Sequence, residues 1–181
     1  FKIRGKRLVD ILVVISMLSP PFIGAYSWIL MLGRNGVITN FMKNTFGFHM
    51  PDIYGFTGIL LVFTLKLFPY IYMYTKGALK KMDASLGEAA ESLGYHGLRK
   101  VLGISLPLIA PTVLAGGTIV FLRAFADYGT PRLIGEGYST MPVIIYQEWV
   151  SETGNNAFFA SSVALIMMLV AAIVFLLQQY F

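Results

Sequence analysis

The sequence predicts an all-α protein, folded as a multi-pass bundle of membrane-spanning helices. Hydrophobic residues make up 56% of its 181 residues and charged residues only 13%, against about 45–50% and about 25% in soluble proteins. The mean hydropathy is +0.70. The apolar residues gather in four runs, and each is close to or above the roughly 20 residues that a helix needs to cross a bilayer. We expect these spans at residues 8–32, 54–76, 107–126 and 158–181.

Composition also limits the function classes. The net charge is +5, but the basic residues lie beside the apolar runs and form no basic face interleaved with aromatic residues. We therefore expect a lipid bilayer as partner and no nucleic acid. The sequence has no cysteine, which excludes disulfides and thiolate metal sites.

The first expected span contains two adjacent prolines, Pro20 and Pro21. Proline removes a backbone donor and clashes with the preceding turn, so a kink or a break is predicted here. In lipid such a break persists only against protein or along a water-filled path. A packing kink and a place in a translocation path both remain open.

The second span contains a charged residue near its centre, and the third span has two at its end. Lys66 lies near the centre of the second span with Tyr70 on the same face, and an intramembrane lysine marks a cavity or a partner by default. The alternatives are snorkelling along its own stem or pairing with a helix outside this sequence. Arg123 and Asp127 end the third span at i, i+4 spacing, which predicts a local ion pair. Coordination of a passing solute is the alternative, and we include all four residues with the two prolines as translocation-path candidates.

Two connecting segments should carry short helices. Residues 37–53 are mixed in character and predict an external helix and loop. Residues 127–156 are too many for a featureless loop. Pro142 is suited to the start of a helix that carries Tyr146 and Trp149 as anchors at a membrane interface.

The segment 83–106 is the one long polar interruption. Asp83 can cap a helix, and Ser85 with Glu88 forms a Ser-x-x-Glu capping box. Gly94 supplies the left-handed residue that commonly ends a helix. Spacing of i, i+3, i+4 and i+7 puts four small or apolar residues on one face: Leu86, Ala89, Ala90 and Leu93.

Seven positions between residues 88 and 107 resemble the EAA motif of ATP-binding-cassette (ABC) importer permeases with the type I fold. They are Glu88, Ala89 and Ala90, then Gly94, and finally Ile104, Leu106 and Pro107. The resemblance implies a cytoplasmic coupling helix that docks into a cleft of a separate ATPase subunit. In that position Leu86, Ala89, Ala90 and Leu93 would fill the cleft, Glu88 would meet polar or basic groups at its rim, and Gly94 would permit the turn onto the next helix. Two alternatives stay open: a helix lying on its own protein, and a capping role for Glu88.

The basic residues support a cytoplasmic position for this segment, because inner segments are enriched in Lys and Arg. With that orientation eight basic residues lie inside: Lys2, Arg4, Lys6, Arg7, Lys80, Lys81, Arg99 and Lys100. Three lie outside: Arg34, Lys43 and Arg132. His49 and His96 then fall on opposite sides of the membrane and cannot share a metal, so no metal site is expected.

An enzyme is not predicted. The sequence lacks the Gly-x-x-x-x-Gly-Lys-Ser/Thr phosphate loop, so we expect no cofactor on this chain, with ATP and Mg²⁺ on a partner. The resemblance implies alternating access, driven by a cytoplasmic ABC ATPase dimer. It also implies a second permease half or copy, an extracytoplasmic solute-binding protein, and a place in the bacterial inner membrane.

For the solute, residues 126–135 and 154–156 resemble the ferric-iron branch of these permeases. Polyamine, phosphonate and thiamine permeases share similar strings and remain alternatives, with a non-transporting membrane scaffold more remote. Four carboxylates expected on the outer side offer the oxygen ligands that hard cations prefer: Asp127, Glu136, Glu148 and Glu152. The alternative is that they are solvated loop residues that dock a binding protein. Such permeases have five or six spans per half. Since four are found here, and the chain runs from Phe1 to an apolar end at Phe181, we expect part of a longer polypeptide.

Overall fold

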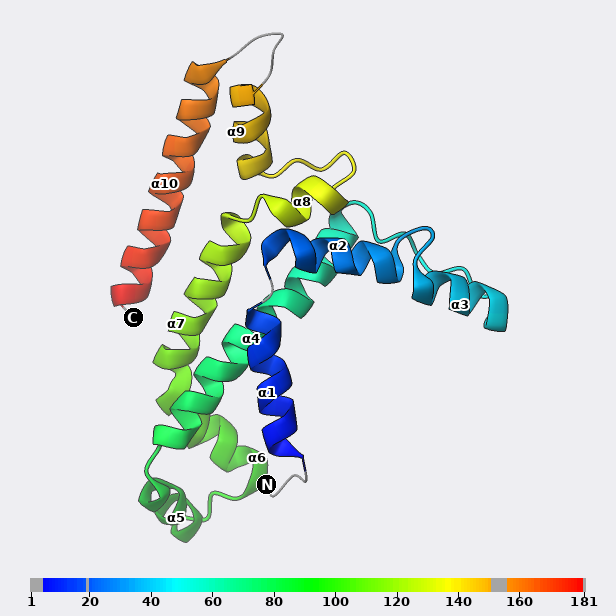
Figure 1. The fold of residues 1–181 in the computed structure, drawn as a ribbon. Coiled ribbons are helices and arrows are strands. Elements are labelled where there is room, and N and C mark those ends of the chain that lie inside the picture. Colours follow the sequence, from blue (N-terminus) through cyan, green and yellow to red (C-terminus); the bar gives the residue numbers. More distant parts are fainter. Residues whose placement is uncertain (1–4, 19, 151–155, 181) are drawn as a thin grey trace.

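The computed structural model describes residues 5–18, 20–150 and 156–180, and everything below concerns these residues. Within them every regular element is helical, which confirms the predicted all-α class (Figure 1). Three helical stretches are long and apolar enough to cross a membrane: Phe56–Lys81, Gly97–Phe125 and Ala157–Tyr180. A fourth span forms if a bent pair near the N-terminus is counted as one. The chain is therefore a multi-pass membrane bundle.

The bent pair is the expected first span. Helix α1 is Lys6–Met17 and α2 is Pro21–Leu32, and the two segments that would make the span are bent by 111°. Pro20 is the residue before α2, with φ −59° and ψ 144°, a conformation outside the helical region. The break expected at the two prolines thus replaces a straight span over 8–32. Helix α2 and the following α3 (Val37–Phe46) extend sideways from the bundle (Figure 1).

The second and third spans pack against each other as α4 (Phe56–Lys81) and α7 (Leu106–Phe125). A Cβ placed on Gly116 would lie 2.9 Å from the Cβ of Tyr74, so this glycine is what lets the two helices approach. The next residue, Gly117, faces open space. Of these two adjacent glycines, only Gly116 therefore provides a close approach between the helices.

The helical stretch that contains α7 begins at Gly97, well before residue 107, where the third span was expected to start. The short α6 (Gly97–Lys100) and a π-helical turn, Val101–Ser105, lead into it without interruption. Pro107 follows this turn and cannot donate to the preceding carbonyl, a situation in which helices widen or kink. Residues 97–105 are thus a continuous helical extension of the third span.

Helices α6 and α5 (Ala84–Ser92) lie at one end of the bundle, which we call the α5 end. The short α8 (Gly129–Ile134) lies at the other, the α8 end (Figure 1). After α8, α9 (Met141–Val150) packs against α10 (Ala157–Tyr180). The expected short helix with Tyr146 and Trp149 is α9.

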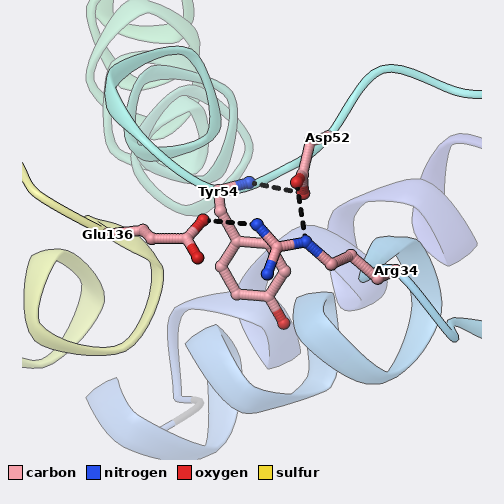
Figure 2. A network of polar contacts seen from close by, with 4 residues as sticks. All are labelled: Arg34, Asp52, Tyr54 and Glu136. Carbon is pink, nitrogen blue, oxygen red and sulfur yellow. Dashed lines mark hydrogen bonds and ion pairs between the residues drawn. The ribbon is translucent and has the colours of Figure 1, made fainter.

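The α8 end holds the densest packing. Ala25, Val62, Thr130 and Ile134 are fully buried there and join α2, α4 and α8. At this end Arg34 also connects two loops that are far apart in the sequence, through ion pairs with both (Figure 2). Its Nε donates to Asp52 Oδ2 at 2.9 Å and its Nη2 to Glu136 Oε2 at 2.7 Å, with the guanidinium 4.8 Å from the ring centre of Tyr54.

Candidate functional site

A cavity of about 420 Å³ lies where α1, α2, α4, α7 and α8 meet, and we call it the central cavity. Lys66, Tyr70, Arg123 and Asp127 all line it. Four of the six translocation-path candidates, from two different spans, are therefore brought together in one place.

Lys66 and Asp127 form an ion pair across this cavity. The Lys66 side chain is 21% exposed and that of Asp127 only 8%. The second carboxylate oxygen of Asp127 accepts from the backbone N–H of Thr130 at 2.8 Å, so Asp127 also orders the start of α8. This partly buried pair links both spans and α8, because separating it would leave the buried Asp127 carboxylate without a partner.

The predicted ion pair between Arg123 and Asp127 is wrong. Helix α7 ends at Phe125, so Asp127 lies beyond the helix and the i, i+4 geometry does not apply. The partner of Lys66 is therefore within this chain and not on a helix outside the sequence.

Arg123 instead stacks on Tyr70, with its guanidinium carbon 4.5 Å from the ring centre. No carboxylate pairs with it among the described residues. The cavity thus contains two cations and one carboxylate, and one of the cations keeps its donors available.

The two prolines contribute to the central cavity through Phe22, the residue that follows them. Pro20 is exposed and does not line the cavity, whereas Phe22 in the first turn of α2 does. The Phe22 ring lies 6.1 Å from that of Tyr128, edge to face, and Tyr128 lies 4.9 Å from Tyr146. The side chain of Pro21 is outside the described part.

Sequence reasoning missed Phe22 and Thr130 as residues of this site. A signal existed for Phe22, because a helix that restarts after two prolines directs its first turn toward the break. For Thr130, only the order of helices in space could reveal that α8 covers Lys66.

A metal centre has no support in the described residues, which contain no group of three or more His, Cys, Asp or Glu placed to hold an ion. Of the outer carboxylates, Asp127 and Glu136 are held in ion pairs with Lys66 and Arg34. Glu152 lies outside the described residues. The available polar chemistry is that of cationic donors.

At the α5 end, the local helix signals are only partly as expected. Asp83 caps α5 by accepting from the Ser85 backbone N–H at 2.9 Å, and this hydrogen bond lowers the pKa of the Asp83 carboxyl. Since α5 begins at Ala84, Ser85 is inside the helix and its capping box with Glu88 does not form. Glu88 is exposed and free of the capping role that competed with docking.

Gly94 ends this helix as predicted. Its φ is 81°, a left-handed conformation that costs an ordinary residue about 1–2 kcal/mol. The N–H of Tyr95 then closes on the carbonyl of Ala90 at 2.9 Å, the bond that typically accompanies a left-handed helix end. Lys100 of α6 donates to Glu91 at 2.8 Å and lowers the pKa of that carboxyl, which fixes the turn from the other side.

The apolar face of α5 is divided. Leu86 and Ala89 are exposed and Leu93 is 77% exposed, but Ala90 is only 2% exposed. Ala90 was expected to fill a partner's cleft with the other three residues, but it is buried within this chain; the docking role of this face stays a prediction. Leu98, at 78% exposed, extends the uncovered apolar surface onto α6.

Comparison with known proteins agrees with the family resemblance of the EAA motif. The profile of the family described as "Binding-protein-dependent transport system inner membrane component" matches residues 1–181. A ferric transport system permease protein of Actinobacillus pleuropneumoniae is 28% identical over 166 residues, which cover 91% of this chain and 24% of the relative.

Two other relatives have different solutes in their names. One from Salmonella typhimurium, named for 2-aminoethylphosphonate transport, is 26% identical over 153 residues, 82% of this chain and 54% of the relative. A molybdenum transport system permease protein of Haemophilus influenzae is 29% identical over 147 residues, 78% of this chain and 63% of the relative. The chain thus spans about a quarter of the ferric relative and less than two thirds of the others.

Proposed function

The chain belongs to the family of inner membrane components of binding-protein-dependent transport systems, and from this premise we propose that it couples ATP hydrolysis on a partner ATPase to alternating access. It is an ABC importer permease, as the EAA motif indicated. The partners in this proposal are an ABC ATPase dimer, which binds the ATP and Mg²⁺, a second permease half or copy, and an extracytoplasmic solute-binding protein. The proposed location is the bacterial inner membrane.

One observation carries the coupling proposal: the uncovered apolar surface of α5 and α6. Leu86, Leu93 and Leu98 are exposed at the end of the bundle opposite the central cavity. Apolar residues gathered on a polar segment indicate a protein interface. Glu88, exposed beside them, would meet the rim of the ATPase cleft.

A rigid connection between the two ends supports the same mechanism. Helices α4 and α7 run from the α5 end to the central cavity and are held together at Gly116. A push on α5 and α6 would be transmitted along α7, because α6 continues into it without a break. The response would be a change in the packing around Lys66 and Asp127, which we propose as part of the translocation path.

Two candidate solutes follow. Ferric iron is supported by the strings at residues 126–135 and 154–156 and by the ferric relative. An oxyanion such as a phosphonate is favoured by Arg123, whose guanidinium has no carboxylate partner among the described residues. A bare ferric ion would be repelled by Lys66 and Arg123, so the iron proposal requires an ion that crosses with anionic ligands.

The ATPase activity of the purified transporter separates these solutes. Stimulation by a ferric-loaded binding protein supports iron, and stimulation only by a phosphonate-, polyamine- or molybdate-loaded one removes it. The alternative of a non-transporting scaffold survives only if no ATPase purifies with the permease.

The coupling role is tested by Gly94→Asp. We expect normal membrane insertion with loss of solute uptake, because the substitution strains the turn that presents α5 and adds a charge there. Gly47→Asp is the matched control, since Gly47 ends α3 with a φ of 64° and also has open space around it. Unchanged uptake in Gly94→Asp, or equal loss in both variants, contradicts the role.

A further inference from the structure

A second cavity, of about 530 Å³, lies toward the α5 end of α4, beside the start of α1. We call it the basic pocket. It is lined by Lys6, Tyr72, Thr75, Lys76, Leu79 and Lys80. The central cavity shares none of these residues.

The charges in the basic pocket are unbalanced. Lys76 pairs with Asp10 of α1, and Asp10 also accepts from the Tyr72 hydroxyl at 2.7 Å. Lys6 and Lys80 have no carboxylate partner in the described part of the chain. Three ammonium groups therefore face one carboxylate, and the two at the rim are available to an anion.

The rest of the lining is suited to a molecule that is only partly polar. Leu79 and the ring of Tyr72 are apolar, and the lysine stems add methylene groups. Thr75 supplies a hydroxyl that can bond an oxygen. The pocket lies at the end of an apolar span, so one side adjoins the position of the headgroups and the other that of the acyl chains.

From this arrangement we infer that the basic pocket binds the phosphate of an anionic phospholipid in the leaflet on the α5 side. The ammonium groups of Lys6 and Lys80 contact the phosphate, Thr75 donates to one of its oxygens, and an acyl chain follows Leu79. Basic pockets between spans on the cytoplasmic side are the usual sites for such headgroups. A soluble phosphate would gain nothing from the apolar half of the lining.

The site has a structural consequence for the broken first span. Asp10 makes the polar contacts between α1 and α4 described above, with Lys76 and Tyr72, and both of these residues line the pocket. A bound phosphate, with one negative charge, would offset part of the positive charge of Lys6 and Lys80, whose repulsion otherwise opposes the approach of the two helices. Bound lipid therefore fixes α1 against α4.

The test is lipid binding by the intact transporter in native mass spectrometry. Phosphatidylglycerol and phosphatidylcholine are titrated onto the wild type, the double variant Lys6→Gln/Lys80→Gln, and Lys81→Gln. Lys81 is the control, because it is the next residue on α4 but does not line the basic pocket. Its substitution removes one positive charge, so a general loss of charge near the surface would already weaken binding about fivefold in this variant. Elution of each variant with its partner subunits confirms that it has folded.

We expect phosphatidylglycerol to bind the wild type and Lys81→Gln alike, and the double variant to bind it roughly thirtyfold more weakly, since each lysine near the surface contributes about one kcal/mol. Phosphatidylcholine should bind weakly to all three. Equal phosphatidylglycerol binding by all three, or no preference over phosphatidylcholine, overturns the inference. Displacement of phosphatidylglycerol by millimolar inorganic phosphate also overturns it, because the site would then serve a soluble anion.

Discussion

The two ends of the bundle are built in opposite ways. At the α8 end, Val62, Thr130 and Ile134 are fully buried, and Arg34 holds carboxylates from two distant loops. At the α5 end, Leu93 and Leu98 remain exposed on a short turn that is held by one ion pair, Lys100 with Glu91. The α8 end is stabilised by its own contacts, whereas the α5 end has an apolar surface that no described residue of the chain covers.

This difference indicates that the two ends of the bundle have different roles. A packed end with a buried ion pair has few alternative arrangements, so a change there requires a large input of free energy. A weakly held helix at the other end can follow a moving partner. In the proposed mechanism, the continuous helical segment through α7 converts movement at one end into repacking at the other.

The largest effect is expected for Lys66→Met. This substitution leaves the buried Asp127 carboxylate without its cation, which should destabilise the fold by about 3–5 kcal/mol and lower the Tm of the purified permease by roughly 10 °C. The double variant Lys66→Met/Asp127→Asn should recover part of that loss, because no unpaired charge remains. Lys43→Met, on the exposed α3, is the control. A Tm equal to that of the control contradicts a stabilising pair.

The contact between α4 and α7 provides the second comparison. Gly116→Ala places a Cβ 2.9 Å from that of Tyr74, so the helices must separate at a cost of about 1–3 kcal/mol. Gly117→Ala meets nothing within 4 Å and should be neutral or slightly stabilising, because alanine favours helix. Thermal unfolding of the two variants measures the difference. Equal Tm values would show that the helices do not depend on this contact.

At the α5 end, Leu93→Ala should leave the Tm of the permease almost unchanged, because the side chain is exposed. The same substitution should reduce the amount of ATPase that purifies with the permease, since the residue lies on the proposed interface. Leu165→Ala, on the exposed surface of α10, is the control. Undiminished ATPase recovery in Leu93→Ala would remove this residue from the interface.

The smallest effect concerns pH. The pKa values of Asp83 and Glu91 lie below their ordinary values of 3.8 and 4.5, because each carboxylate accepts a hydrogen bond, from Ser85 and Lys100 respectively. Since the folded-state pKa is lowered, their contribution to α5 is present above those ordinary values and is lost as the pH falls through the lowered ones. Hydrogen exchange of residues 83–95, corrected for the intrinsic rate, should therefore be constant from about pH 8 to 5.5 and faster below about pH 4. Faster exchange already at pH 6 would contradict these assignments.

The sequence was most informative where the cause of a structure is local. The two prolines predicted the break before α2, and Gly94 predicted the end of α5, because both effects follow from backbone geometry. Asp83 and Ser85 were both suited to cap α5, and only the first does. Hydropathy located the long helices, since the length of a span depends on the bilayer.

The sequence could not predict the contacts between elements that are distant from each other along the chain. The partner of Lys66 was missed because helical spacing paired Asp127 with Arg123, and the end of α7 at Phe125 breaks that spacing. Burial of Ala90 was not predicted, because helical periodicity places it on the same face as the exposed Leu86 and Leu93. The basic pocket likewise requires the start of α1 beside the end of α4, a neighbourhood visible only in the fold.

The central claim is that α5 receives the movement of a cytoplasmic ATPase. Because the chain has no cysteine, Ala89→Cys provides a single thiol on the exposed side of α5, and Lys43→Cys provides one on α3. We predict that the thiol at position 89 cross-links to the ATPase subunit, with a yield that changes on ATP binding, and that in whole cells a membrane-impermeant reagent labels only the thiol at position 43. Labelling of position 89 from outside the cell, or no cross-link in an active transporter, would contradict the account.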